Sequence, residues 1–144
     1  KMLFFNPGRA IPVLPFIGGK TAIFDEDMAP LYEYHIDLQE HLGELCYVFV
    51  IKARDGLKGG KKDRVVIDEM TTWFAVKSFE VIARNYTMSY NAGIYDFDVQ
   101  MQVEMTRASG YLVPRLLRYT GNWDVIFKKR ENGVFTATLF DFGK

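Results

Sequence analysis

Cysteine and histidine, which supply most metal ligands and many nucleophiles, are scarce in this chain of 144 residues, which has one cysteine and two histidines. A single cysteine, Cys46, cannot form an internal disulfide, and this excludes a disulfide-stapled scaffold. His35 and His41 lack a second cluster of cysteine, histidine or carboxylate residues to complete a metal site. The sequence therefore predicts no metal and no cofactor.

Neither an excess of charge nor a long apolar run is present. The 18 basic side chains balance the 18 acidic ones, so no overall field draws the molecule to DNA or to an anionic membrane. The longest apolar run, Leu45 to Ile51, is far shorter than the roughly 20 residues that a transmembrane helix needs. No signal-peptide pattern is visible. We expect a soluble chain without a membrane span, whose compartment the sequence leaves open.

Recognisable catalytic motifs are missing too. The sequence contains no G-x-S-x-G nucleophile elbow. The pair Gly60-Lys61 matches the end of a phosphate-binding loop, but Asp55 stands where the first glycine belongs and Lys62 where serine or threonine belongs. We therefore predict no catalytic residue and favour a non-enzymatic role over an enzyme.

Aromatic residues are abundant instead, at 15% of the chain, and they favour half-buried strand surfaces. Between Tyr95 and Thr106, apolar and polar residues alternate without exception, which predicts a strand with one buried and one wet face. The apolar segment Leu45 to Arg54 predicts a second strand, covered on both faces. We predict one β-dominated domain over residues 1–144, all-β or α+β. Its antiparallel sheet closes as a barrel or sandwich, with one or two short helices.

The first twenty residues have a different composition, with three prolines and three glycines. Proline lacks a backbone donor and cannot occupy a central strand. We predict that residues 1–20 form an extended arm, whose apolar side chains cover the domain itself or a neighbouring molecule.

The segment Ala29 to Gly43 fits two structures. As a helix, Asp27 would cap it, Pro30 would lie in its first turn and Gly43 would end it. These start and stop signals favour the helix. As a strand, a Leu42-Gly43 turn would pair its residues with the next strand: Leu38 opposite Tyr47, Ile36 opposite Phe49, Tyr34 opposite Ile51, and Glu33 opposite Lys52.

Three signals concern the second half of the chain. The alternation changes phase after Ala83, which predicts a β-bulge. Pro114 excludes a central strand around it and leaves an edge strand or a short helix. Asn132-Gly133 predicts a two-residue hairpin turn, which would place Glu131 opposite Val134, Phe127 opposite Thr138, Val125 opposite Phe140, and Trp123 opposite Phe142.

Candidate contact residues fall into two groups of opposite charge. Basic residues gather in the glycine-rich loop after the apolar strand and at the predicted turn, and suit a polyanion or a protein partner: Lys52, Arg54, Lys58, Lys61, Lys62, Arg64, Lys128, Lys129 and Arg130. The wet face of the alternating strand offers an acidic partner surface: Asp96, Asp98 and Glu104. We predict that the basic loop of one copy meets the acidic strand of another.

These features favour a structural or assembly subunit of a larger complex, of the virion, phage-tail or secretion type, which self-associates or binds other subunits through its arm and its protruding loop. This expectation rests on analogy of fold. One alternative is single-stranded nucleic-acid binding through the basic loop, residues 52–64. Another is a small apolar ligand, or an enzyme site, inside a barrel or cone.

Overall fold

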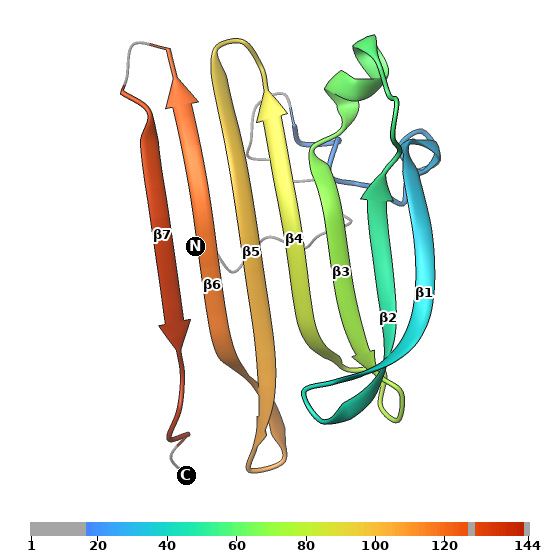
Figure 1. Ribbon diagram of the computed structural model, residues 1–144, viewed down its shortest axis with the longest axis vertical. Helices are drawn as coiled ribbons and strands as arrows, with labels where there is room; N and C mark the ends of the chain where they lie inside the picture. Colours follow the sequence, from blue (N-terminus) through green and yellow to red (C-terminus); the bar gives the residue numbers. More distant parts are fainter. Residues whose placement is uncertain (1–16, 127–128, 143–144) are drawn as a thin grey trace.

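The computed structural model describes residues 17–126 and 129–142, whose seven antiparallel strands form one sheet (Figure 1). Each strand pairs with the next along the chain. Two short 3-10 helices, η2 (Ala29–Leu31) and η3 (Gly59–Arg64), precede β1 and β3, and no helix in the described ranges could cross a membrane. The strands are β1 (Tyr32–His41), β2 (Glu44–Ala53), β3 (Ile67–Ala75), β4 (Val81–Asn91), β5 (Tyr95–Ala108), β6 (Tyr111–Val125) and β7 (Glu131–Thr138).

The helix favoured for residues 29–43 is wrong, because this segment forms η2 and then β1. The pairing that the strand alternative predicts is confirmed, including Leu38 with Tyr47 and Ile36 with Phe49. Leu42 and Gly43 have φ angles of 51° and 78°, as a tight type I′ hairpin turn requires. The cross-strand pairs outweigh the local helix signals, since every apolar residue of β1 meets an apolar residue of β2.

Strands β2 to β4 follow the sequence closely. The segment predicted at Leu45 to Arg54 is β2, and the bulge expected after Ala83 lies at Ile82. There Trp73 pairs with Ala83 while Phe74 pairs with Val81, so one residue of β4 is left over. A second bulge leaves Asp68 of β3 unpaired between Ile67 and Glu69. Each bulge interrupts the ladder locally and changes the direction in which the neighbouring side chains point.

Pro114 lies inside β6, which is an interior strand, so the prediction that it excludes such a strand is wrong. Two local features explain this. The ladder between β5 and β6 is irregular at this point, because Glu104 pairs with Leu116 and Met105 with Pro114. In addition, β7 pairs with β6 only from Leu116 onward, so Pro114 has a neighbouring strand on one side alone.

The prediction of a hairpin turn at Asn132-Gly133 is also wrong. Both residues lie within β7, where Asn132 pairs with Asn122 and Gly133 with Gly121. The indole of Trp123 lies across the two glycines, since a Cβ added to Gly121 would stand 2.6 Å from its ring and one added to Gly133 would stand 3.2 Å from it. These glycines therefore make room for an aromatic ring inside the sheet, where they lack the positive φ of a turn.

The two faces of the sheet differ in chemistry. One row of directly paired residues crosses all seven strands on the apolar face: Tyr34, Ile51, Met70, Tyr86, Met101, Tyr119 and Phe135. The next row crosses the polar face: His35, Val50, Thr71, Asn85, Gln102, Arg118 and Thr136. The alternation that β5 shows in sequence thus continues across the sheet.

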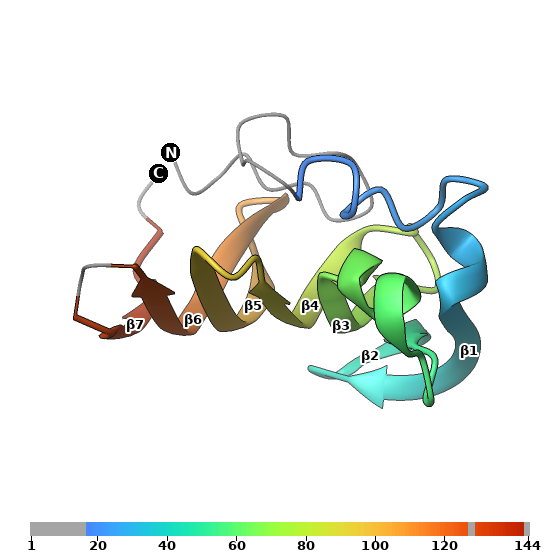
Figure 2. The same cartoon turned by 90° about the horizontal axis from the view of Figure 1, so that it is seen from above.

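Residues 17–31 cover one part of the apolar face, as Figure 2 shows from above. Their apolar side chains are buried with those of β1 to β4, and the main core consists of Ile17, Ile23, Met28, Leu31, Tyr32, Ile51, Val66, Ile67, Met70, Tyr86 and Met88. Lys20 fixes this cover by donating a hydrogen bond to the Asp63 carbonyl oxygen at 2.7 Å and another to the Tyr90 hydroxyl. Residues 1–16 of the predicted arm lie outside the described residues.

A smaller core lies on the polar face, where the end of the β1–β2 hairpin bends over the sheet (Figure 1). Cys46, Ala75 and Ile82 are buried there, and the His41 ring stacks on Trp73 at 4.4 Å between centroids. Glu44 beside the turn also accepts a hydrogen bond from Arg107 of β5. Cys46 thus packs as a small apolar residue.

The described structure is β-dominated and antiparallel, with little helix. Strands β1 and β7 are the two edges of the sheet and do not pair with each other, so the sheet is not closed. The predicted closure as a barrel or sandwich is therefore not confirmed among the described strands.

Candidate functional site

A group of exposed apolar side chains lies on the apolar face of β1 and β2, beside the covered part. We call it the aromatic strip, and it consists of the exposed Phe24, Tyr34, Ile36, Leu38, Tyr47 and Phe79 together with the half-buried Phe49 on which Phe24 and Tyr34 stack. Ile36 is 65% exposed and Phe79 is 68% exposed. Monomeric proteins seldom leave a contiguous apolar patch of this kind in water, because each uncovered ring or aliphatic chain costs hydration free energy.

The rings of the strip are held in place by stacking and by one hydrogen bond. Phe24, Tyr34 and Phe49 form a triangle with centroid distances of 6.1–6.5 Å. The Tyr34 hydroxyl donates to the Ile23 carbonyl oxygen at 2.8 Å, which ties the strip to the covering segment. Because these rings are already ordered, a partner that lands on them loses little side-chain entropy.

Phe79 extends the strip from the turn between β3 and β4. Its ring stacks on Tyr47 at a centroid distance of 5.9 Å, while its φ of 57° lies in the left-handed region. A residue with a Cβ adopts this region at a cost of about 1–2 kcal/mol. The turn thus holds an exposed aromatic ring in a strained backbone conformation, and such strain concentrates at functional sites.

Strand β1 also presents an open backbone edge. The Arg54 N–H donates to the Leu31 carbonyl oxygen at 2.9 Å, which makes Tyr32 and Ala53 a pair without mutual hydrogen bonds. In an antiparallel ladder the even-numbered residues of β1 then point their N–H and C=O groups away from β2. Among the described residues no further strand pairs with this edge, and an edge strand with unpaired backbone groups is a template for another strand.

A carboxylate occupies part of this edge. Asp37 accepts a hydrogen bond from the Leu38 N–H at 2.7 Å and one from the Gln39 side-chain amide at 3.0 Å. The Gln39 amide, then the Leu38 N–H and, more weakly, the charge of His35 lower the pKa of the Asp37 carboxyl. Charged caps of this type limit uncontrolled pairing of edge strands.

The predicted basic residues lie around the loop 54–64, and their arginines serve the fold. Arg54 donates to the Pro30 carbonyl oxygen at 3.0 Å and reaches Glu33 at 3.3 Å, while Arg64 meets Asp27 at 2.6 Å. Lys52 lies 3.9 Å from Asp55. Within the described ranges Lys58, Lys61 and Lys62 have no ion pair, and η3 carries the last two of them.

Two of the three predicted acidic residues are paired with arginines, one in β6 and one just before β7. Asp96 meets Arg130 at 3.0 Å, and Glu104 meets Arg115 at 2.6 Å. The Arg130 side chain thus reaches back to the sheet while it stays exposed to solvent. Of the other residues predicted at that turn, Lys129 is exposed and Lys128 lies outside the described residues.

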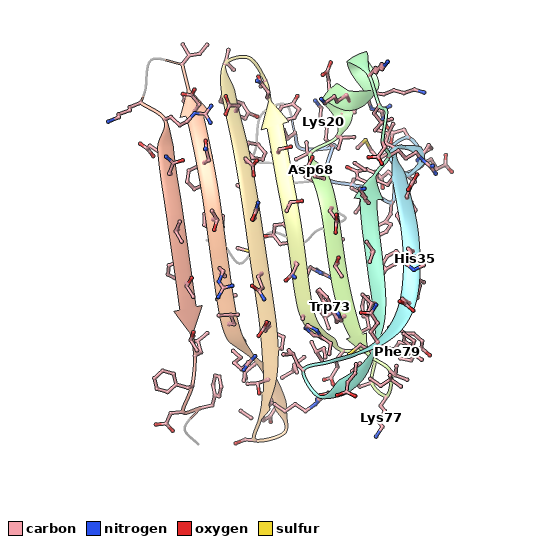
Figure 3. The ribbon with its side chains drawn as sticks, in the orientation of Figure 1. Lys20, His35, Asp68, Trp73, Lys77 and Phe79 are labelled. Atoms are coloured by element: carbon pink, nitrogen blue, oxygen red, sulfur yellow. The ribbon has the colours of Figure 1, made fainter. Side chains whose placement is uncertain are left out.

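The basic loop and the acidic strand border one groove of about 780 Å³ on the same molecule. Lys52, Arg54 and Lys62 line it on the loop side, and Asp68, Asp96 and Asp98 on the sheet side. Burial raises the pKa of the Asp68 carboxyl, which the Ser89 hydrogen bond offsets in part and repulsion from Asp98 increases. Figure 3 shows Asp68 near the end of the sheet that this loop overhangs.

Other perturbed groups belong to the core of the sheet. Burial raises the pKa of Tyr32 to about 12, although the backbone of Ile67 and Val66 lowers it, and the Tyr32 hydroxyl forms no well-shaped hydrogen bond. Burial likewise lowers the pKa of Arg84, whose Nε donates to the Thr72 hydroxyl at 2.9 Å. Neither Tyr32 nor Arg84 lines the groove between the basic loop and the acidic strand.

The described residues contain no cluster of ligands that could hold a metal ion. His35 and His41 both lie in β1, on the polar face of the sheet. Six residues of strand place them about 20 Å apart, which is too far to share one ion. Figure 3 shows His35 on its strand, well away from Trp73, the ring that His41 covers.

Sequence reasoning missed the aromatic strip as a candidate site. Its signal lies in the alternation of Tyr34, Ile36 and Leu38, but the start and stop signals of the same segment favour a helix over that strand. Phe24 and Phe79 could not be added from sequence, because their contacts with β1 and β2 depend on how two distant turns fold back.

Comparison with known proteins identifies no relative of this chain: no protein-family model, no curated protein and no solved structure matches it. The function must therefore be inferred from the surfaces of the molecule.

Proposed function

We propose that this chain is a non-enzymatic structural subunit that self-associates within a larger protein complex, of the kind found in virions, phage tails or secretion systems. The observation that carries the proposal is the aromatic strip beside the open edge of β1. Exposed, pre-ordered aromatic side chains next to free backbone groups suit association with another polypeptide.

The contact surface proposed here differs from the one expected from sequence. The basic loop and the acidic strand face each other across a groove of one molecule, and Asp96 and Glu104 already have arginine partners. Little charge is left on the acidic strand for a second copy. Among residues 17–126 and 129–142, no side chain covers the outer side of the aromatic strip, which favours it as the association surface.

The experiment is light scattering after size-exclusion chromatography over a range of protein concentrations. The native chain should form a defined oligomer, and Ile36→Lys should shift it toward monomer because a charge in the strip must be desolvated on association. Ile94→Lys is the matched control, since Ile94 is also exposed, at 51%, but lies outside the strip. A native chain that stays monomeric at every concentration would refute the proposal.

Binding of single-stranded nucleic acid is the second candidate, and it is supported by Lys58, Lys61 and Lys62, whose ammonium groups lack carboxylate partners in the described structure. The acidic sheet side of the adjoining groove opposes a phosphate backbone there. A double variant, Lys61→Glu with Lys62→Glu, separates the candidates. It should abolish any salt-sensitive gel shift of labelled single-stranded DNA, and it should leave oligomerisation through the strip unchanged.

A further inference from the structure

We infer that a second copy of this chain pairs with the open edge of β1, so that two β1 strands run antiparallel about a two-fold axis at Ile36. This inference rests on the proposed function and specifies its contact. Antiparallel pairing of an edge strand with itself forms a closed, isologous dimer, in which each residue meets its symmetry partner. Pairing β1 with β7 of another copy would be heterologous and open-ended, and with the apolar faces of both copies on the same side it would run parallel, because β1 and β7 point the same way in the sheet.

The backbone geometry fixes which residues exchange hydrogen bonds. The even-numbered residues of β1 face the free edge, so Ile36 of each copy would donate its N–H to the Ile36 carbonyl oxygen of the other. Tyr34 of one copy would likewise pair with Leu38 of the other. The aromatic strips of the two copies then become one continuous apolar surface, because their side chains lie on the same face of the joined sheet.

Charge favours this register over the two registers in which the axis is moved by one residue. With the axis at Ile36, His35 of each copy lies opposite Asp37 of the other on the polar face, and both pairs can hydrogen-bond. Moving the axis one residue toward the N-terminus would place Glu33 opposite Asp37. Moving it one residue toward the C-terminus would place the two Asp37 carboxylates opposite each other. Like charges directly opposite destabilise a strand pair.

The Asp37 carboxylate would control which strands can pair with this edge. In the single chain its carboxylate accepts the Leu38 N–H, which is one of the donors that a second strand would use. When His35 of a second copy approaches, Asp37 can turn to it and release the Leu38 N–H to the Tyr34 carbonyl oxygen of that copy. The edge is thus covered against unspecific strands but open to one that brings a donor opposite Asp37.

Cysteine cross-linking tests the register directly. Paired residues that exchange hydrogen bonds have Cα atoms about 5.5 Å apart, which suits a disulfide. Ile36→Cys should therefore form a covalent dimer on mild oxidation. Leu38→Cys alone should not, because four residues of strand place its two copies about 13 Å apart. A mixture of Tyr34→Cys and Leu38→Cys chains should cross-link as a heterodimer. The native Cys46 does not compete, since it is fully buried.

Four further variants separate backbone hydrogen bonding from side-chain contacts. Ile36→Pro removes an N–H that faces away from β2, so the fold should persist while the dimer dissociation constant rises roughly tenfold or more. Ile36→Ala is its control and keeps the N–H. His35→Asp should also weaken the dimer, and the double variant His35→Asp with Asp37→His should restore it, because the exchange recreates both opposite pairs.

The results of these experiments test self-association, the pairing of β1 and its register separately. An oligomer that forms without the Ile36→Cys cross-link overturns the β1 pairing but leaves self-association standing. Cross-linking of Leu38→Cys to itself overturns the register. A native chain that is monomeric at all concentrations overturns both proposals. In that last case, dimerisation after removal of residues 1–16 would identify the N-terminal segment of the same chain as the occupant of the edge.

Discussion

The two halves of the sheet are built on different principles. In the described residues, every buried apolar side chain of the core lies between Ile17 and Met88, in β1 to β4, in the segment that covers them, or at Val66 just before β3. In the half that contains β5 to β7, Gly121 is the sole buried residue among those that the structure describes. The first half has a core in the usual sense, whereas the second is a sheet with half-buried side chains on its apolar face.

Different interactions hold the second half together. Long ladders join β5 to β6 and β6 to β7, and arginines link neighbouring strands across the polar face, as Arg115 does with Glu104 at 2.6 Å. On the apolar face Tyr119 stacks on Trp123 at 5.7 Å. This contrast shows that backbone pairing and ring contacts can extend a sheet beyond its core, at a lower density of buried apolar surface.

The largest expected effect comes from shortening a methionine in each half. Met70→Ala, in the core of β3, should lower the free energy of unfolding by about 2–5 kcal/mol, because it removes buried apolar atoms and leaves a cavity. Met105→Ala, in β5, removes the same atoms from a half-buried site and should cost about 1 kcal/mol. Urea denaturation of both variants measures the difference, and equal losses would show that the second half has a core of its own.

The next effect probes how the second half packs without a core. Gly121→Ala places a methyl group 2.4 Å from the Tyr119 hydroxyl and 2.6 Å from the Trp123 ring, so both rings must move. We expect a loss of about 1–3 kcal/mol and a changed tryptophan fluorescence spectrum. Gly60→Ala is the control, because nothing lies within 4 Å of its added Cβ. An unchanged stability in Gly121→Ala would mean that the packing of the Tyr119 and Trp123 rings does not stabilise β6 and β7.

The two halves also differ in how far the sequence reveals them. The strand at Tyr95 to Thr106 and the apolar β2 could be predicted, because period-two alternation and apolar runs are local signals. The register of β1 followed from apolar matching with β2. The position of Asn132 and Gly133 within a strand could not be predicted. Asn-Gly suits a turn locally, and the indole of Trp123 that lies over Gly133 belongs to another strand.

The candidate site shows the same limit. The basic and acidic residues could be found by counting charge, but their meeting in one groove depends on the order of strands β2 to β5. The aromatic strip depends on Phe24 and Phe79, which reach β1 and β2 from separate turns. Alternation within one strand predicts a face, whereas a surface built from several elements requires the fold.

A smaller effect tests the strained turn beside the strip, in the half that has a core. Phe79→Gly and Phe79→Ala both remove the ring from Tyr47, but glycine adopts the φ of 57° without the steric cost that alanine pays. Phe79→Gly should therefore be more stable than Phe79→Ala by about 1 kcal/mol. Both variants should weaken self-association equally. Equal stabilities in thermal denaturation would show that the backbone at this turn carries no strain.

The smallest expected effect lies at the junction of the two halves, where Asp68 of β3 faces Asp98 of β5 across the groove. Burial, and to a lesser degree Asp98, raise the pKa of Asp68 in the folded protein, so the folded state binds its proton more tightly than the unfolded state does. The stabilisation from this proton is complete below the unfolded pKa and is lost as the pH rises through the folded pKa. Asp68→Asn should therefore raise the melting temperature by roughly 1–2 °C at pH 7 and leave it unchanged near pH 3. Asp98→Asn should give a smaller rise over the same pH range, because it removes the repulsion and keeps the burial. A rise of equal size at both pH values would show that the charge of Asp68 is not its cause.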